Sequence, residues 1–284
     1  MITSPNLANA IVKLVAADAL PALLGHLLIG NLVQRDYEPV IANHGDKVST
    51  PIPGTPRPAQ VALDTHTEAT FQIPDVTKAV AFPELLRAYM LPAVTVISER
   101  IERDLLGFYS QFTVNPILGI PGTPIAEDDI DAAETFLFAA SPGPRSGDKF
   151  LVVDPPSYSS IRHIPGFSEY HSAGEAGLRP LVDGNVGKLN DFFVFRSPYV
   201  AVTGNENPTA HNLAFTRLAM LLASRRLPRP LPGTGAVAEY AEIGNFGIRI
   251  VMSYSPNTLA QSFTVDILYG CTVPRNDLGV QIQS

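Results

Sequence analysis

Apolar and polar positions alternate along the chain with two different periods, and these divide it into helical and extended regions. Residues 7–33 are rich in Leu, Ala and Val, with Lys13, Asp18, Pro21 and His26 as interruptions. Apolar side chains at three- and four-residue spacing favour a helix whose one face is buried. We therefore expect one or two amphipathic helices here, forming an N-terminal arm.

Strand-like alternation follows the arm. Residues 47–51 predict one strand, and the alternation resumes over 59–64 and again over 67–73. The segment between the first two, 51–58, contains four prolines and a glycine, which exclude a helix and indicate a turn. We expect one long, protruding β-hairpin over 46–73. Its tip has too few apolar residues to bury itself, so it needs a neighbour to lie on. Three side chains of the last segment share one face: Ala69, Phe71 and Ile73.

The clearest helical pattern runs from Pro83 to about Gln111. Pro83 suits a first helical position, and Glu84 in the first turn faces the positive end of the helix dipole. Pro92 lies inside the pattern and predicts a kink or a division into two helices. The apolar face consists of Leu86, Met90, Ala93, Ile97, Ile101, Leu105 and Phe108. Two pairs of opposite charge at four-residue spacing lie on exposed faces: Glu99 with Arg103, and Arg100 with Asp104.

The remainder predicts an α/β middle and a β-rich end. The middle comprises a helix between Pro124 and Pro142, a second helix over 212–222, and three short strands at 150–153, 192–195 and 199–202. A glycine-containing loop region at 166–187 separates the first two strands. The end comprises strands at 236–241, 247–254 and 261–271, joined by turns. The fold class is therefore α+β.

The amino-acid composition limits the number of domains and the kinds of binding partner that we expect. The 284 residues are 45% apolar and 17% charged, with 26 prolines, which indicates a loop-rich protein of one large domain or two modest ones. A formal net charge of −7 argues against wholesale electrostatic binding of nucleic acid. It does not exclude a protein that lies beside DNA without binding it tightly.

Neither a disulfide nor a membrane segment is expected. Cys271 is the single cysteine, and we interpret it as a small buried residue of a strand. Near the N-terminus, the longest run without Lys, Arg, Asp or Glu is 19–34, which includes Pro21 and is too short for a convincing membrane span. Residues 1–10 lack the basic start of a signal peptide. We expect the protein to stay in the compartment where it is made.

Sequence motifs for catalysis are weak. No two of the six histidines have the four-residue spacing of a helical metal site, and the nearest cluster, His163 and His171 with Glu169 and Glu175, is more typical of a solvated loop. No nucleophile elbow, phosphate-binding loop or Cys-x-x-Cys is present, and the glycines of 233–238 lack the preceding strand that a dinucleotide site requires. We expect no cofactor, no metal and no enzymatic activity.

The most basic point of the chain is a cluster of three arginines, Arg225, Arg226 and Arg229. They are candidates for contact with DNA or with an acidic neighbour. The alternative, solubilising charge beside a proline-rich turn, remains open.

The order of these parts resembles the Hong Kong 97-type capsid fold of tailed bacteriophages. Several short sequence segments are similar to those of the coat-protein family typified by the Salmonella podovirus, and the resemblance extends from about residue 25 to 280. It rests on Gly30-Asn-Leu-Val-Gln-Arg-Asp-Tyr37, Gly45-Asp-Lys-Val48, Tyr89-Met-Leu-Pro-Ala93, Ile101-Glu-Arg-Asp-Leu-Leu-Gly107, and Asp266-Ile-Leu-Tyr-Gly270 followed by Pro274-Arg275. The family's type protein carries a large insertion domain, for which 199–212 is too short.

The resemblance implies a major capsid protein that forms hexamers and pentamers of an icosahedral shell around double-stranded DNA. It divides the chain into an N-arm (1–43), an E-loop hairpin (44–75), a spine helix (76–114), an A-domain (115–235) and a P-domain with the C-terminus (236–284). It implies as partners further copies of the chain, a scaffolding protein, a portal protein, a decoration protein and packaged DNA bound without sequence specificity. The implied location is the virion capsid, assembled in the host bacterial cytoplasm.

Residues for contacts between subunits follow from the same comparison. We expect them on the hairpin and on the outer face of the long helix, at Lys47, Arg57, Asp64, Phe71, Arg87, Arg100, Arg103 and Asp104. The bend at Pro92 is the candidate for a change during shell maturation. Lys47 is the one lysine of the hairpin, and we expect no cross-link through it. Two alternatives stay open: an encapsulin-like cellular shell, and a soluble α/β hydrolase with an unrecognised Ser, His and Asp.

Overall fold

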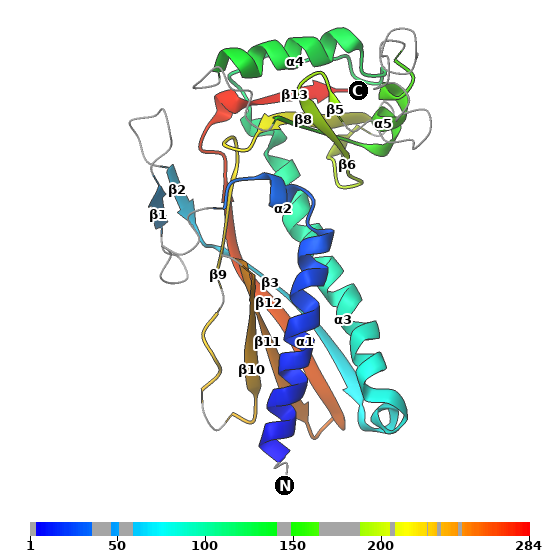
Figure 1. The fold of residues 1–284 in the computed structure, drawn as a ribbon, viewed down its shortest axis with the longest axis vertical. Coiled ribbons are helices and arrows are strands. Elements are labelled where there is room, and N and C mark those ends of the chain that lie inside the picture. The colour runs from blue at the N-terminus through cyan, green and yellow to red at the C-terminus, as the bar shows by residue number, and fades with distance from the viewer. Residues whose placement is uncertain are drawn as a thin grey trace.

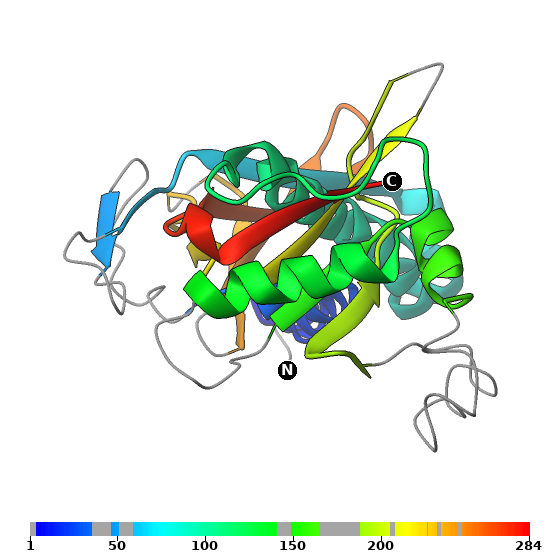
Figure 2. The same ribbon diagram turned by 90° about the horizontal axis from the view of Figure 1, so that it is seen from above.

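The structure is a computed structural model, and it describes residues 4–35, 47–50, 59–140, 149–164, 188–204, 208–225, 227–231, 234–243 and 246–284. The molecule is elongated, with the N-terminus at one end and the C-terminus near the other (Figure 1). A long lower part and a smaller upper part each contain one large sheet. A separate two-stranded hairpin projects to one side between them (Figures 1 and 2).

The lower part is an antiparallel sheet covered on one face by two long helices. Its strand order is β10-β11-β12-β3, and β9 pairs with the other end of β12. The strands are β3 (Thr65–Pro74), β9 (Leu221–Arg225), β10 (Val237–Ile243), β11 (Phe246–Ser255) and β12 (Ala260–Thr272). The helices α1 (Ser4–His26) and α3 (Asp75–Leu106) lie beside each other on this sheet (Figure 1).

The upper part is a mixed sheet of order β13-β8-β4-β6-β5, with β7 paired to β8. Its strands are β4 (Lys149–Val153), β5 (Lys188–Leu189), β6 (Phe192–Arg196), β7 (Val202–Thr203), β8 (Thr209–Thr216) and β13 (Gly279–Gln283). The helix α4 (Glu127–Ala140) lies across it, and α5 (Pro155–Ile161) lies at one end (Figure 2). The 3-10 helix η2 (Gly107–Gln111) leads from α3 into this part, and η3 (Asn276–Leu278) leads into β13.

The hairpin consists of β1 (Lys47–Thr50) and β2 (Ala59–Ala62). The expected third strand is present, but it belongs elsewhere: all ten residues of β3 pair with β12 of the lower sheet. Its alternation explains this, since Ala69, Phe71 and Ile73 point inward while Thr70 and Gln72 are exposed. The expectation of one hairpin over 46–73 is therefore wrong in extent. The predicted tip, 51–58, lies outside the described residues.

The long helix begins earlier than predicted and is not divided. It starts at Asp75, after Pro74 at the N-cap, so Pro83 lies within it and not at its first position. It also continues through Pro92 as one element. A proline deprives the carbonyl four residues back of its N–H partner. Here that residue, Ala88, is exposed, as is Pro92, so water can reach the carbonyl.

The prediction of a helix over 212–222 is wrong. These residues form the end of β8, a turn, and the start of β9, which belong to different sheets. The central strand β8 lies between β13 and β4, and residues 210–216 are buried on both faces. A short strand that is buried on both faces, as here despite His211, Asn212 and Thr216, shows no alternation and cannot be distinguished from a buried helix by periodicity alone.

The arm helix α1 is also more deeply embedded than expected. We expected this segment to form an N-terminal arm, yet Val12, Val15, Ala19, Leu20 and Leu23 are buried in the main core, against β10, β11 and α3. Its apolar stripe therefore stabilises its own chain. Several elements were not predicted, among them α5 and β13. The latter carries the C-terminal residues to the upper sheet, whereas the three predicted terminal strands lie in the lower one.

A buried lysine fastens α4 to the upper sheet. Lys149, the first residue of β4, is almost fully buried, and its Nζ lies 3.5 Å from Glu134 of α4 and 3.3 Å from Asp191. A buried charge is stable only when it is compensated in this way. The sequence analysis did not single out Lys149, because a lysine just before an apolar strand is usually exposed.

The inner face of α3 can be tested with two neighbouring residues. Ile97 is fully buried in the main core, whereas Val96 is exposed. We expect Ile97→Ala to reduce the free energy of unfolding by about 2–5 kcal/mol, because it removes buried methyl groups and leaves a cavity. Val96→Ala should change it by less than about 0.5 kcal/mol. Chemical denaturation measures both, and equal effects would contradict the orientation of α3.

Candidate assembly surfaces

The root of the hairpin, the C-terminal end of α3 and strand β12 surround a polar cleft of about 500 Å³. Four of the residues predicted for subunit contacts, from distant parts of the chain, line it together: Asp64, Arg100, Arg103 and Asp104. Asp64 comes from the turn between β2 and β3, and the other three from the last turns of α3. Tyr269 and Cys271 of β12 form the opposite wall.

Asp104 is the centre of the cleft's hydrogen bonds. Its carboxylate lies 3.1–3.2 Å from the Arg100 Nε and accepts a hydrogen bond of 2.6 Å from the Tyr269 hydroxyl. The Coulombic attraction of Asp104 raises the pKa of Arg100, and burial, followed by the bond to Asp104, raises the pKa of Tyr269. Burial likewise raises the pKa of the Cys271 thiol, which disfavours the reactive thiolate. The cleft thus has fixed charges and no activated nucleophile among its described residues.

Arg103 contacts the upper part of the chain. Its guanidinium lies 5.1 Å from the centre of the Tyr199 ring, within the range of a cation–π interaction. Burial raises the pKa of Tyr199, and a side-chain hydrogen bond with Glu99 raises it further. The predicted Glu99 and Arg103 therefore both meet Tyr199, a residue that the sequence pattern did not single out.

An apolar strip on the outer face of α3 leads to this cleft. Tyr89, Leu91 and Val96 are 44%, 46% and 56% exposed, and Pro92 beside them is exposed too. Large apolar side chains gathered on one helix face are typical of a surface that is covered in an assembly. Tyr89, Pro92 and Val96 share one face at three- and four-residue spacing, and we call them the α3 strip; Leu91, two residues after Tyr89, lies at another edge of the exposed side. Phe71, another predicted contact residue, stacks on Tyr89 and on Phe263 of its own chain, with ring centres 6.2 and 5.4 Å apart.

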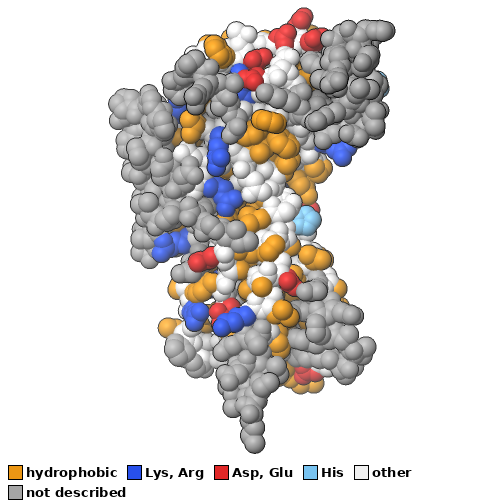
Figure 3. Space-filling view, in the orientation of Figure 1, with side chains coloured by type: hydrophobic (Ala, Val, Ile, Leu, Met, Phe, Trp, Pro, Cys, Tyr) orange, Lys and Arg blue, Asp and Glu red, His pale blue; other side chains and the backbone are white. Residues whose placement is uncertain are grey.

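The other predicted residues are less clustered. Lys47 lies in β1 and Arg87 in α3, but their side chains, like Arg57 and Arg226, lie outside the described part of the chain. Arg225 ends β9 and is half-buried. Arg229 lies 3.4 Å from Glu239 and 5.3 Å from the centre of the Tyr240 ring, so strand β10 of its own chain holds it. The face seen in Figure 3 mixes hydrophobic side chains with both signs of charge.

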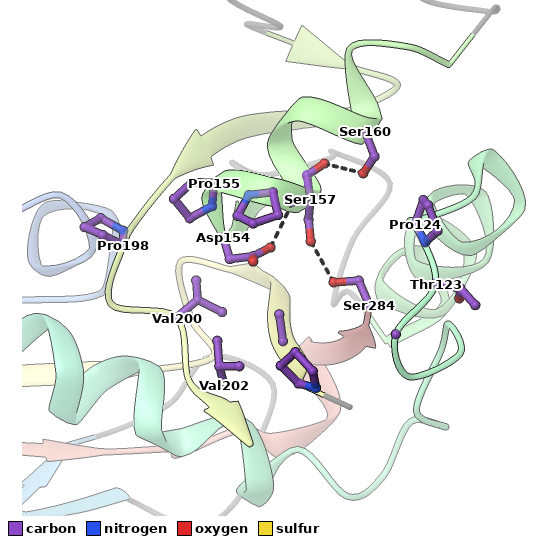
Figure 4. A pocket seen from close by; sticks show the side chains of 14 residues that line it. Thr123, Pro124, Asp154, Pro155, Ser157, Ser160, Pro198, Val200, Val202 and Ser284 are labelled. Atoms are coloured by element: carbon purple, nitrogen blue, oxygen red, sulfur yellow. Dashed lines mark hydrogen bonds between the residues drawn. The ribbon is translucent and has the colours of Figure 1, made fainter. Parts of the chain in front are cut away.

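A second concavity of about 520 Å³, at the upper end, tests the hydrolase alternative (Figure 4). Its wall is largely proline and valine, and its polar groups satisfy one another. The Ser157 and Ser284 hydroxyls are 2.6 Å apart, the Asn212 amide donates to Ser284, and Asp154 caps α5 by accepting from the Ser157 N–H. Each of the two serine hydroxyls is bonded to the other and to the Asn212 amide, and no histidine is among the described residues that line this concavity.

Among the described histidines, the buried one is His211, which lies outside this concavity and packs within the upper sheet. His211 in β8 stacks on Tyr109 with ring centres 4.2 Å apart, and its Nε2 and Nδ1 lie 2.7 Å from Thr203 and 2.6 Å from Gln281. Burial lowers its pKa. Of the predicted histidine cluster, only His163 is described. It is exposed, and its Nδ1 lies 2.7 Å from the Ser159 carbonyl oxygen.

Within the described residues, no group of three His, Cys, Asp or Glu side chains is arranged to hold a metal ion. No described helix is long and apolar enough to cross a membrane.

Comparisons with known proteins identify the fold. No protein-family model and no curated protein matches the chain. Solved structures do. A chain from Mycobacterium phage Che8 aligns with a TM-score of 0.61 at 15% identity, over 90% of each chain. The capsid of Ralstonia phage GP4 aligns with a TM-score of 0.58 at 13% identity, over 89% of this chain and 87% of the other. The SrpI encapsulin of Synechococcus elongatus aligns at 0.56 and 12%, over 89% and 85%.

The chain therefore has the fold that phage capsid and encapsulin shell proteins share. The likeness covers both sheets and the long helix between them, since about nine tenths of the chain is aligned.

The root of the hairpin offers a test of the cleft. Gly270 in β12, between the cleft residues Tyr269 and Cys271, passes so close to the hairpin that a Cβ there would overlap the Ala62 carbonyl oxygen. A Cβ on Gly107, which lines the cleft, would meet nothing within 4 Å. We expect Gly270→Ala to lower the free energy of unfolding by about 1–3 kcal/mol and to speed amide exchange at 61–65. Gly107→Ala should do neither. Unchanged exchange in Gly270→Ala would show that the root is not held by this contact.

Proposed function

We propose that the chain is the major capsid protein of a tailed phage, which assembles into hexamers and pentamers of an icosahedral shell around double-stranded DNA. The observation that carries the proposal is the alignment of about nine tenths of the chain with phage capsid structures. The sequence resemblance adds the Hong Kong 97-type fold and the Salmonella podovirus coat-protein family, without its insertion domain. The proposal keeps the five divisions at 1–43, 44–75, 76–114, 115–235 and 236–284 as its outline, with the difference that β3 and β9 belong to the lower sheet and β13 to the upper one.

The surfaces of the chain support assembly with further copies. The hairpin has two strands and projects from the body (Figure 2). Its β2 side packs on its own chain, where Val61 is buried against Leu221 and Leu268, whereas β1 pairs with no described strand other than β2. The α3 strip is apolar and uncovered. In the proposed shell, the hairpin of one subunit lies over α3 of a neighbour and covers this strip, and the charged cleft beside it aligns the two. Lys47, Arg57 and Arg87 remain proposed contacts there, with Asp64, Arg100, Arg103 and Asp104.

Other parts of the proposal extend beyond the single chain. The partners are a scaffolding protein, a portal protein at one vertex, a decoration protein and DNA packaged without sequence specificity, with assembly in the host cytoplasm. Arg225, Arg226 and Arg229 remain proposed contacts for DNA or a neighbour, and Arg229 already contacts Glu239 and Tyr240 of its own chain. Pro92 remains the proposed position for a change in α3 during maturation. We infer no enzymatic role.

An encapsulin-like cellular shell is the second candidate, and the alignment with the SrpI encapsulin favours it. Both candidates use the same subunit, so the contents of the particle distinguish them.

The full chain should be expressed alone and together with the products of its neighbouring genes, and the particles examined by negative-stain electron microscopy. Closed shells whose DNA resists nuclease after packaging support the phage capsid. Shells that enclose a protein cargo support the encapsulin-like alternative. A 30.5 kDa monomer under all conditions contradicts both.

The α3 strip can be tested at a single position. We expect Val96→Asp to abolish particles or to reduce their yield at least tenfold, because it places a charge on a surface that is buried in the shell. The exposed position leaves the subunit folded, which circular dichroism checks. Val96→Thr keeps the size of the side chain without the charge and should assemble. Normal particles from Val96→Asp would exclude this face from the contact.

A further inference from the structure

One carboxylate of α3 points into the protein interior. Glu102 is only 1% exposed and lies on the core-facing side of α3. Its Oε1 accepts hydrogen bonds from the backbone N–H groups of Ile29, at 2.7 Å, and Gly30, at 3.3 Å. Its other oxygen, Oε2, is buried and has no hydrogen-bond partner in the described part of the chain. A buried charged group is normally paired or fully hydrogen-bonded, so this half-satisfied carboxylate requires an explanation.

The bonds of Glu102 attach the N-terminal helices to α3. They go to the junction between α1, which ends at His26, and α2 (Ile29–Leu32). The same turn is closed from the other side by Asn31, whose amide donates to the carbonyl oxygens of Leu24 and Leu27. The remaining contacts of α1 with its own chain are largely apolar. Glu102 therefore supplies a polar, protonatable attachment for the arm.

Few charged groups face this carboxylate. From the arm it meets backbone N–H groups, while Lys13 and His26 of α1 are exposed and Asp18 is half-buried. From the 197–201 segment it meets Tyr199, whose pKa is raised in part by the charge of Glu102. On α3 itself, Glu99 and Arg103 flank it and contact the same tyrosine. No described cation is paired with Glu102 in an ion pair that would stabilise its charged form.

We propose that Glu102 is a proton-dependent latch: in its protonated form it holds the α1–α2 turn firmly on α3, and on ionisation it loosens that attachment. The protonated acid retains a carbonyl oxygen that accepts from the Ile29 and Gly30 N–H groups. Ionisation adds a buried charge without a partner for Oε2. The latch is a property of the single chain and does not depend on the proposed shell function. In a shell it would couple the docking of the arm to pH.

The direction of the pH dependence follows from the pKa. Burial raises the pKa of Glu102 from 4.5 to about 7, and the hydrogen bonds from Gly30, Ile29 and Leu28 offset this only in part. A group whose folded pKa is raised stabilises the docked arm below its unfolded pKa, and this contribution is lost as the pH rises through 7. The difference corresponds to a change on the order of a hundredfold in the docking equilibrium between pH 4.5 and 8.

Hydrogen exchange followed by mass spectrometry tests the latch in the full chain. The quantity compared is the protection factor of the amides in 27–33, which corrects for the intrinsic pH dependence of exchange. We expect it to fall at least tenfold from pH 5.5 to pH 8.5 in the natural sequence. Glu102→Gln keeps the shape and both accepted bonds without the charge, so its protection should stay within about threefold. Glu68→Gln, at an exposed position of β3, should behave like the natural sequence.

A flat protection factor in the natural sequence overturns the proposal, even if Glu102→Gln does not fold. A fall of equal size in Glu102→Gln also overturns it, because another group would then be titrating. Since the measurement needs no particles, its failure is distinguishable from a failure of the proposed capsid function.

Discussion

The packing of α3 against two partners determines the arrangement of the rest of the chain. A 32-residue helix extends about 48 Å, which is about the length of the 13-residue strand β12, so α3 runs along the whole lower sheet and reaches the upper part. Its inner face, with Met90, Val94, Ile97, Ile101 and Leu105, is buried between α1 and the lower sheet. Its C-terminal end continues through η2 to the upper sheet. Because one helix serves both parts, it also sets the position of the cleft, the hairpin root and the Tyr199 contact.

The same packing leaves two surfaces of the subunit without a partner in its own chain: the outer face of α3 and part of the hairpin. The inner face of α3 is filled by its own chain, so the outer face with Tyr89, Pro92 and Val96 is uncovered. The hairpin leaves the body next to the end of this helix, where Gly270 and Ala62 are in close contact. An uncovered apolar face beside a projecting hairpin is the arrangement expected of a subunit completed by further copies. The arm contributes differently from what its composition suggested, because α1 is part of the core and not a free extension.

Periodic elements could be predicted from the sequence, and context-dependent ones could not. The core-facing residues of α3 and the strands β10, β11 and β12 follow from their spacing alone. The start of α3 at Asp75 could not be predicted, because Pro83 resembles a first-turn proline and only the pairing of β3 with β12 shows where the helix begins. The 212–222 segment was misassigned because strand burial on both faces removes the alternation that identifies a strand.

For the candidate site, too, the sequence predicted some residues but could not show how they come together. Asp64, Arg100, Arg103 and Asp104 were predicted as surface contacts, but only the fold shows that they line one cleft. No sequence pattern marked Tyr269 and Tyr199 as site residues, since their roles depend on contacts with residues far away in the sequence. Glu102 did carry one: it is four residues after Ser98 and three before Leu105, on the buried side of the helix. A carboxylate at a core position of an amphipathic pattern is the kind of residue that sequence analysis should examine.

The central claim is that the outer face of α3 is an interface between copies of this chain. A cryo-electron microscopy reconstruction of the assembled particle tests it most directly. The account predicts that Tyr89, Pro92 and Val96 are covered in each subunit by the β1–β2 hairpin of an adjacent one. A shell in which this face is open to solvent and the hairpins contact other elements would contradict it.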